Sequence, residues 1–145
     1  VAEMKARPGF AIAGLDWGPA ASRELAARFS PQWLDSLSDF QHFLRTGFAL
    51  YDVERYGDAL AVFERLEAKL GGEPPLKGVG LIWQGHMLDL LGRRPEALVR
   101  YRTAADLGLT MTWMHSQYGL KYEISRYAGE RLRTPFTRIE NRQGD

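Results

Sequence analysis

The residues best able to do chemistry in this chain of 145 residues are its three histidines. His86 and Asp89 lie one helical turn apart, and His115 could approach them from a neighbouring helix. Such a His-Asp-His set could hold zinc or polarise a water molecule. The stretch His-Met-Leu-Asp, however, supplies no second pair of ligands. We therefore expect structural or surface roles for the histidines, and we predict no metal site and no cofactor.

The sequence also lacks the common motifs of catalytic sites. It contains no Gly-rich phosphate-binding loop, no Gly-x-Ser-x-Gly stretch and no paired carboxylates. The double glycine at 71–72 is followed by Pro74 and Pro75, where a phosphate-binding loop would need a lysine and a hydroxyl. We predict that the protein is not an enzyme and has no catalytic residue.

Composition and charge narrow the classes of partner. Hydrophobic residues make up 45% of the chain and aromatic residues 12%, which argues against disorder. Nineteen basic and eighteen acidic side chains leave a net charge of +1, so no overall field draws the protein to nucleic acid or to an anionic membrane. No apolar run reaches the length of a membrane-spanning helix. The absence of cysteine fits the cytoplasm or the periplasm, and we expect a soluble protein of one of the two.

A cluster of arginines is a local exception to this balance of basic and acidic side chains. Arg93, Arg94, Arg100 and Arg102 surround a single acidic residue, Glu96. The cluster could contact a phosphate or an acidic peptide. A solvated helix face has the same composition, and this is the interpretation that we adopt.

Two stretches of the chain share one spacing of glycine, alanine and an aromatic residue. In each, the alanine follows the glycine by twelve positions, and the aromatic residue follows four positions later. A further glycine, Gly119, follows the second of these glycines by 34 positions. Repeated spacing of this kind is the signature of a protein built from stacked units. The two sets are Gly47, Ala59 and Phe63 in the first stretch and Gly85, Ala97 and Tyr101 in the second.

This pattern is similar to the tetratricopeptide repeat, a pair of antiparallel helices about 34 residues long. In that family the glycine permits close approach of the two helices, and large residues fill the space between hairpins. The likeness covers about residues 40–122, where Phe43, Leu81 and His115 stand at the family's tryptophan position. Arg131 and Pro135 replace the alanine and the aromatic residue of the third unit, which we interpret as a terminal cap. A helical hairpin bundle with coincidentally placed glycines is the alternative.

The resemblance implies an all-α fold. We expect a right-handed superhelical stack of antiparallel helix hairpins, with two full repeats, a C-terminal capping repeat and an N-terminal helical extension. Prolines at helix starts and glycines at helix ends set the boundaries. The expected helices cover about 19–29, a short stretch from 31, 39–52, 57–70, 76–91, 95–107, 110–122 and a final stretch to 133. The expected parts are an N-terminal arm with short helices (1–38), the repeat domain (39–135, in units 39–75, 76–109 and 110–135) and a polar tail (136–145).

In this family the first helix of each repeat lines a concave face that binds peptides. The matching positions here are apolar and aromatic around a few polar groups, which suits an extended or helical peptide with apolar anchors. The resemblance therefore implies a non-enzymatic protein- or peptide-binding module, either an adaptor or the interaction domain of a larger protein. The implied contact residues are Leu44, Phe48, Tyr51, Ile82, His86, Asp89, Trp113, Ser116 and Leu120.

The protein itself could instead fill this concave face. An apolar arm from Phe10 to Leu15, the short helix that contains Trp33 or a second copy of the molecule could cover Leu44 and Phe48. The alternative function is thus a self-capped or self-associating structural domain, with a homo-oligomer as one form of it.

Overall fold

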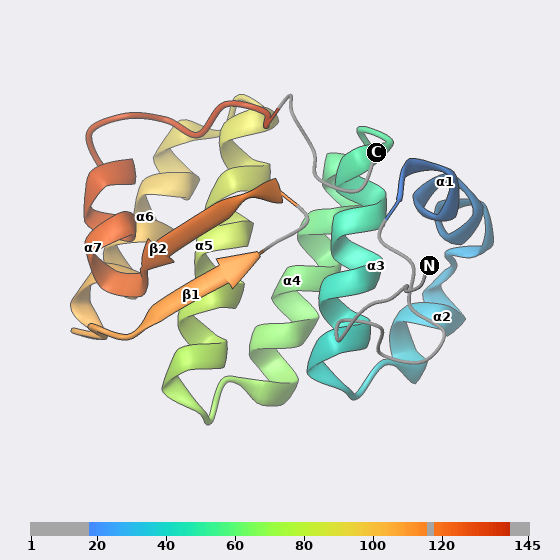
Figure 1. Ribbon diagram of the computed structural model, residues 1–145, viewed down its shortest axis with the longest axis horizontal. Helices are drawn as coiled ribbons and strands as arrows, with labels where there is room; N and C mark the ends of the chain where they lie inside the picture. Colours follow the sequence, from blue (N-terminus) through green and yellow to red (C-terminus); the bar gives the residue numbers. More distant parts are fainter. Residues whose placement is uncertain (1–17, 116–117, 140–145) are drawn as a thin grey trace, which may run out of the picture.

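The computed structural model describes residues 18–115 and 118–139, which form seven helices and two strands. Most of these residues are helical, as predicted, and each helix from α3 to α6 packs against the next one along the chain (Figure 1). The elements are α1 (Pro19–Arg28), α2 (Pro31–Ser36), α3 (Phe40–Asp52), α4 (Tyr56–Leu70), α5 (Pro74–Leu90), α6 (Arg94–Asp106), β1 (Thr112–His115), β2 (Leu120–Glu123) and α7 (Ile124–Arg131).

The helices before residue 107 begin and end close to the predicted positions, and local chemistry explains several of their ends. The Ser30 side chain accepts a hydrogen bond from the backbone N–H of Trp33 at 3.1 Å and so caps α2. The Asp39 side chain caps α3 in the same way through the N–H of His42 at 3.3 Å. Proline stands in the first turn of α1, α2, α5 and α6, where its missing N–H costs no hydrogen bond.

The hairpins α3–α4 and α5–α6 turn in the same way. After α3, Glu54 has a φ of 65°, and the next backbone N–H donates to the carbonyl of Leu50 at 2.8 Å. After α5, Gly92 has a φ of 75°, and the next N–H donates to the carbonyl of Leu88 at 2.8 Å. A left-handed residue closes the helix end in both cases. The equivalence that the sequence spacing predicts for the two hairpins therefore extends to their turns.

In both hairpins a glycine of the first helix lies against an aromatic ring of the second. A Cβ atom at Gly47 would overlap the ring of Phe63, and one at Gly85 would overlap the ring of Tyr101. The alanines of the pattern, Ala59 and Ala97, are buried. These contacts give the glycines the predicted role, which is to let two helices approach closely.

The third unit does not begin with the helix that the sequence pattern predicts. The stretch from about residue 110 to Tyr122 contains two antiparallel strands instead. Their side chains alternate, because Tyr122 and Trp113 face the helices while Met114 is 62% exposed. Gly119, matched to the repeat glycines, has a φ of 65° and stands between the strands. A period of two fits a strand and not a helix, so the all-α prediction is wrong for this stretch.

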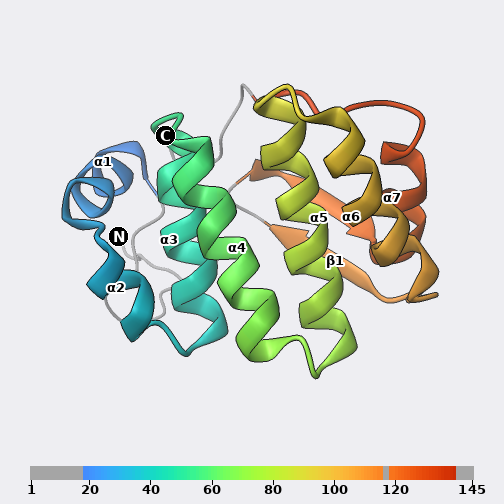
Figure 2. The same ribbon diagram turned by 180° about the vertical axis from the view of Figure 1, so that it is seen from behind.

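The β1–β2 hairpin lies across one side of the helical stack, over α5 (Figure 1). Seen from the opposite side, α5 and α6 lie in front of β1 (Figure 2). α7 packs on α6 at one end of the stack, and α1 packs on α3 at the other. The hairpin therefore closes one side of the stack. The predicted N-terminal arm, residues 10–15, lies outside the described residues.

Candidate peptide-binding face

Four of the predicted contact residues meet on the side of the stack that the hairpin closes. Phe48 and Tyr51 come from α3, His86 and Asp89 come from α5, and each contacts residues that follow α6. Together with Trp83, they define what we call the covered face. Of the predicted contact residues, Leu44, Phe48, Tyr51, Ile82 and His86 are buried, the side chain of Asp89 is 1% exposed, Trp113 and Leu120 are half-buried, and Ser116 lies outside the described residues.

Aromatic rings from the hairpin pack on the middle of the covered face. The ring centroid of Phe48 lies 5.0 Å from that of His115 and 5.1 Å from that of Tyr118, both in edge-to-face contact. It lies 4.7 Å from the ring of Trp83, which is fully buried beneath. Edge-to-face pairs of this kind stabilise a core beyond the area that they bury. The middle of the covered face is therefore part of the protein's own core.

His115 attaches the hairpin to α5 through one ring nitrogen. The indole N–H of Trp83 donates to Nε2 of His115 at 3.1 Å, and the hydroxyl of Tyr122 lies 3.1 Å from the same nitrogen. Because an indole N–H can only donate, Nε2 must carry no proton. Burial lowers the pKa of His115 from 6.5 to about 3, in agreement with a neutral ring.

His86 forms the floor of the covered face. Its ring stacks on Phe136 with the two centroids 3.7 Å apart and an interplanar angle of 13°. Its Nε2 lies 2.7 Å from the hydroxyl of Tyr127 on α7. Burial, with smaller contributions from Arg131 and His115, lowers the pKa of His86 well below 6.5. The ring is therefore neutral at ordinary pH and presents a flat face to an aromatic partner.

The carboxylate of Asp89 accepts hydrogen bonds from three directions. Arg94 donates to both oxygens at 3.0 and 3.1 Å, the hydroxyl of Tyr101 donates at 2.8 Å, and the backbone N–H of Phe136 donates at 2.9 Å. The hydrogen bonds of Asp89 and those of His86 thus go to different partners. Over residues 18–115 and 118–139, no group of three or more His, Cys, Asp or Glu side chains is placed to hold a metal ion.

The residues after α7 lie on the covered face as a segment without regular secondary structure, Phe136–Ile139, which we call the C-terminal segment. Phe136 is buried against His86, Trp83 and Tyr51. The backbone N–H of Ile139 donates to the hydroxyl of Tyr51 at 2.8 Å. The sequence predicts a polar tail over residues 136–145, but Phe136 is 6% exposed and belongs to the core.

Arg138 of the C-terminal segment covers the end of α3. Its Nη1 donates to the carbonyl of Tyr51 at 2.9 Å and to the hydroxyl of Tyr56 at 3.1 Å, and its Nη2 donates to the carbonyl of Asp52 at 2.9 Å. The guanidinium also lies 4.7 Å above the ring of Tyr51. The last carbonyls of a helix have no partner within it and carry a partial negative charge, so a cation is favoured there. Burial raises the pKa of Tyr51 to about 12, so the ring stays neutral.

Asp52 connects the covered face to the N-terminal helix. Its side chain accepts a hydrogen bond from the hydroxyl of Tyr118 at 3.1 Å and one from the hydroxyl of Ser22 at 2.6 Å. The first donor follows β1, and the second lies on α1. One carboxylate at the end of α3 therefore joins α1 to the connection between the two strands.

Sequence reasoning missed Trp83 of the covered face and three residues that lie on it, Tyr118, Phe136 and Arg138. A signal existed for the last two, because a phenylalanine and an isoleucine stand on either side of an arginine in an otherwise polar tail. No local signal marks Trp83, which lies within a helix that is apolar on nearly all sides.

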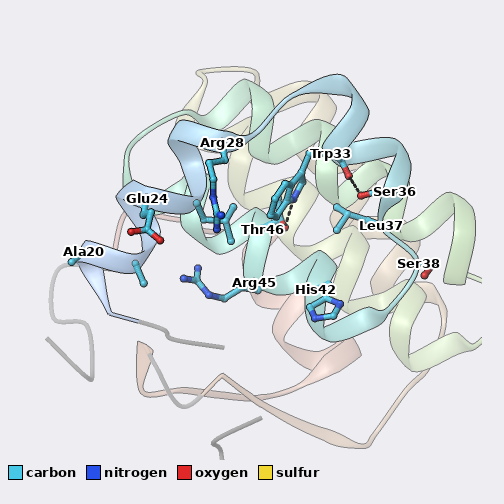
Figure 3. Close-up of a pocket in the computed structure, with 12 residues that line it drawn as sticks. Ala20, Glu24, Arg28, Trp33, Ser36, Leu37, Ser38, His42, Arg45 and Thr46 are labelled. Atoms are coloured by element: carbon cyan, nitrogen blue, oxygen red, sulfur yellow. Dashed lines mark hydrogen bonds between the residues drawn. The ribbon is translucent and has the colours of Figure 1, made fainter. Parts of the chain in front are cut away.

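A second concavity lies between α1, α2 and α3, away from the covered face (Figure 3). It encloses about 620 Å³. Trp33 forms part of its wall and donates its indole N–H to the hydroxyl of Thr46 at 3.1 Å, while Arg28 lies 5.7 Å from the Trp33 ring. Its lining residues are Ala20, Ala21, Glu24, Leu25, Arg28, Trp33, Ser36, Leu37, Ser38, His42, Arg45 and Thr46.

Comparison with known proteins finds no family model, no curated protein and no solved structure that matches this chain. Within the part of the chain that the structure describes, no helix is long and apolar enough to cross a membrane. What the covered face does must therefore be argued from its own geometry.

Proposed function

We propose that this protein is a non-enzymatic peptide-binding module built as a tetratricopeptide-like stack of helix hairpins. The two hairpins that share their glycine contacts and their turns support the repeat assignment. The first helices of these hairpins, α3 and α5, supply the covered face. In our proposal this face recognises an extended segment of protein chain.

The single observation that carries the proposal is the way the C-terminal segment lies on the face. Phe136 enters an aromatic pocket, and Arg138 covers the end of a helix. Between them, Thr137 is exposed. Anchors separated by an exposed residue are the usual pattern of an extended peptide bound in a groove. The surface therefore has the features that peptide recognition needs.

The test frees the face in the full-length chain and offers the segment as a separate peptide. Phe136→Ala combined with Arg138→Ala removes both anchors, and a fluorescently labelled peptide of residues 133–139 serves as the probe. The double variant should bind the peptide at least about tenfold more tightly than the wild type, whose own segment competes at a millimolar effective concentration. Thr137→Ala is the matched control and should behave as the wild type does.

The second candidate function is a self-capped structural domain, favoured by the burial of the predicted contact residues on α3 and α5. One of the three occupants expected from the sequence, the apolar arm at residues 10–15, lies outside the described residues. The same experiment separates the two functions. A double variant that keeps its helical circular dichroism but fails to bind the peptide would contradict peptide recognition and favour the structural role.

A further inference from the structure

We infer that the partner of the covered face is another protein that presents an extended segment with an aromatic residue and, two positions later, an arginine. This inference rests on the function proposed above. It goes further because it specifies which side chains of the bound segment the face recognises and which positions of that segment it leaves unconstrained.

The first requirement is a flat ring at the position of Phe136. The ring lies parallel to His86 at 3.7 Å, and the rings of Trp83 and Tyr51 lie 5.9 and 6.3 Å away. An aliphatic side chain would not fill a slot with these walls, because it lacks the planar face that stacks on an imidazole. The backbone N–H of the same residue donates to Asp89, so proline is excluded there.

The second requirement is a guanidinium at the position of Arg138. Two nitrogens of this group reach three oxygens, namely the carbonyls of Tyr51 and Asp52 and the hydroxyl of Tyr56. The guanidinium carbon also lies 4.7 Å from the centroid of the Tyr51 ring. A lysine ammonium is a point donor that cannot match the planar fork of donors on a guanidinium. The site therefore distinguishes arginine from lysine, although both carry the same charge.

The chain uses arginine in the same way at a second helix end. Arg94 donates through Nη2 to the carbonyls of Arg131 and Leu132 at the end of α7, at 2.7 and 3.2 Å, while its Nη1 binds Asp89. A guanidinium that spans several oxygens at a helix end is thus a recurrent contact in this protein. In the C-terminal segment it comes from a short stretch without regular secondary structure, which another chain could supply.

The remaining positions of the segment set few conditions. Thr137 is exposed, and Ile139 contributes its backbone N–H to Tyr51. The face therefore recognises a segment that has an aromatic residue, then any residue, then arginine, and then a residue other than proline. A partner must displace the C-terminal segment, which carries both anchors. A partner segment with only one of the two anchors would therefore bind too weakly to compete.

The closing experiment measures competition against the labelled peptide bound to the full-length Phe136→Ala, Arg138→Ala variant. Unlabelled peptides carry the native sequence, lysine for the arginine, alanine for the phenylalanine, or alanine for the threonine. The lysine peptide should compete about tenfold more weakly than the native peptide, and the alanine-for-phenylalanine peptide about a hundredfold more weakly. The threonine replacement should change competition by less than about twofold.

A protein-side variant checks that the arginine contact lies where we place it. Tyr56→Phe, added to the double variant, removes one of the three acceptor oxygens and should reduce the ratio of competition strength between the native and lysine peptides.

Equal competition by the arginine and lysine peptides would overturn the inference while leaving peptide binding intact. Absence of binding by the labelled peptide would overturn the proposed function itself. Light scattering could show that the mass of the wild type rises with concentration to twice the monomer mass. The partner would then be a second copy of the chain, which would also overturn the inference.

Discussion

Two buried histidines hold the C-terminal part of the chain on the helices only while they are neutral. His115 accepts a hydrogen bond from Trp83, and His86 stacks on Phe136. Burial lowers the pKa of both rings, and for His115 the value falls to about 3. An unfolded chain would bind protons at both histidines below about pH 6.5, whereas the folded chain does not.

Stability should therefore be full above pH 6.5 and decline as the pH falls from there toward 3. The free energy of unfolding should fall by about 1.4 kcal/mol per pH unit for each histidine. Urea unfolding at about pH 7 and pH 5.5 should differ by about 2 to 3 kcal/mol for the pair. In His115→Gln the glutamine can still accept the hydrogen bond from Trp83 but cannot take up a proton. This variant should therefore lose about half of the pH dependence of the free energy of unfolding. A wild-type slope near zero over this range would show that the histidines are not buried and neutral in solution.

The two hairpins differ in the residue that closes the first helix of each. Gly92 adopts its left-handed conformation without cost, whereas Glu54 pays the penalty of a Cβ atom at a φ of 65°. Glu54 is exposed, and a Cβ at Gly92 would meet nothing within 4 Å. Substitution at Gly92 therefore changes backbone strain and little else, and Glu54→Gly also removes an exposed carboxylate whose charge favours the Arg138 cation.

Glu54→Gly should raise the free energy of unfolding by about 1 kcal/mol, and Gly92→Ala should lower it by about the same amount. Urea midpoints of the two variants measure both effects, and the opposite signs make each variant the control for the other. A loss of stability in Glu54→Gly equal to that of Gly92→Ala would show that the two turns are not equivalent.

Sequence reasoning finds the elements whose signals are local. The α3–α4 and α5–α6 hairpins follow from apolar periodicity and from glycine and proline at helix ends. The β hairpin could not be predicted from the repeat frame, because Gly119 and His115 fit that frame by spacing alone. A short alternating stretch is ambiguous until its partner surface is known. The strands form here because their inner side packs on α5 and on Phe48 of α3.

The candidate site was predicted in part for a similar reason. The resemblance to the tetratricopeptide repeat places Phe48, Tyr51, His86 and Asp89 on the first helices of the two hairpins, α3 and α5, and the structure brings them together on one side of the stack. What lies on them could not, because Phe136 follows Asp89 by 47 positions and contacts it only in the folded chain. The role of a residue in a tail depends on such long-range contacts, and composition does not reveal them.

The whole molecule is a helical stack whose peptide-sized face is occupied by its own C-terminal segment, and our central proposal is that the face binds such segments from another protein. The most direct test is a two-dimensional ¹⁵N–¹H spectrum of the labelled Phe136→Ala, Arg138→Ala variant, recorded while the unlabelled peptide of residues 133–139 is added. We predict that amide signals shift at the end of α3, at Tyr51 and Asp52, and around His86 and Asp89 on α5. Shifts confined to the opposite side of the stack, on α4 and α6, or no shifts at all, would contradict the account.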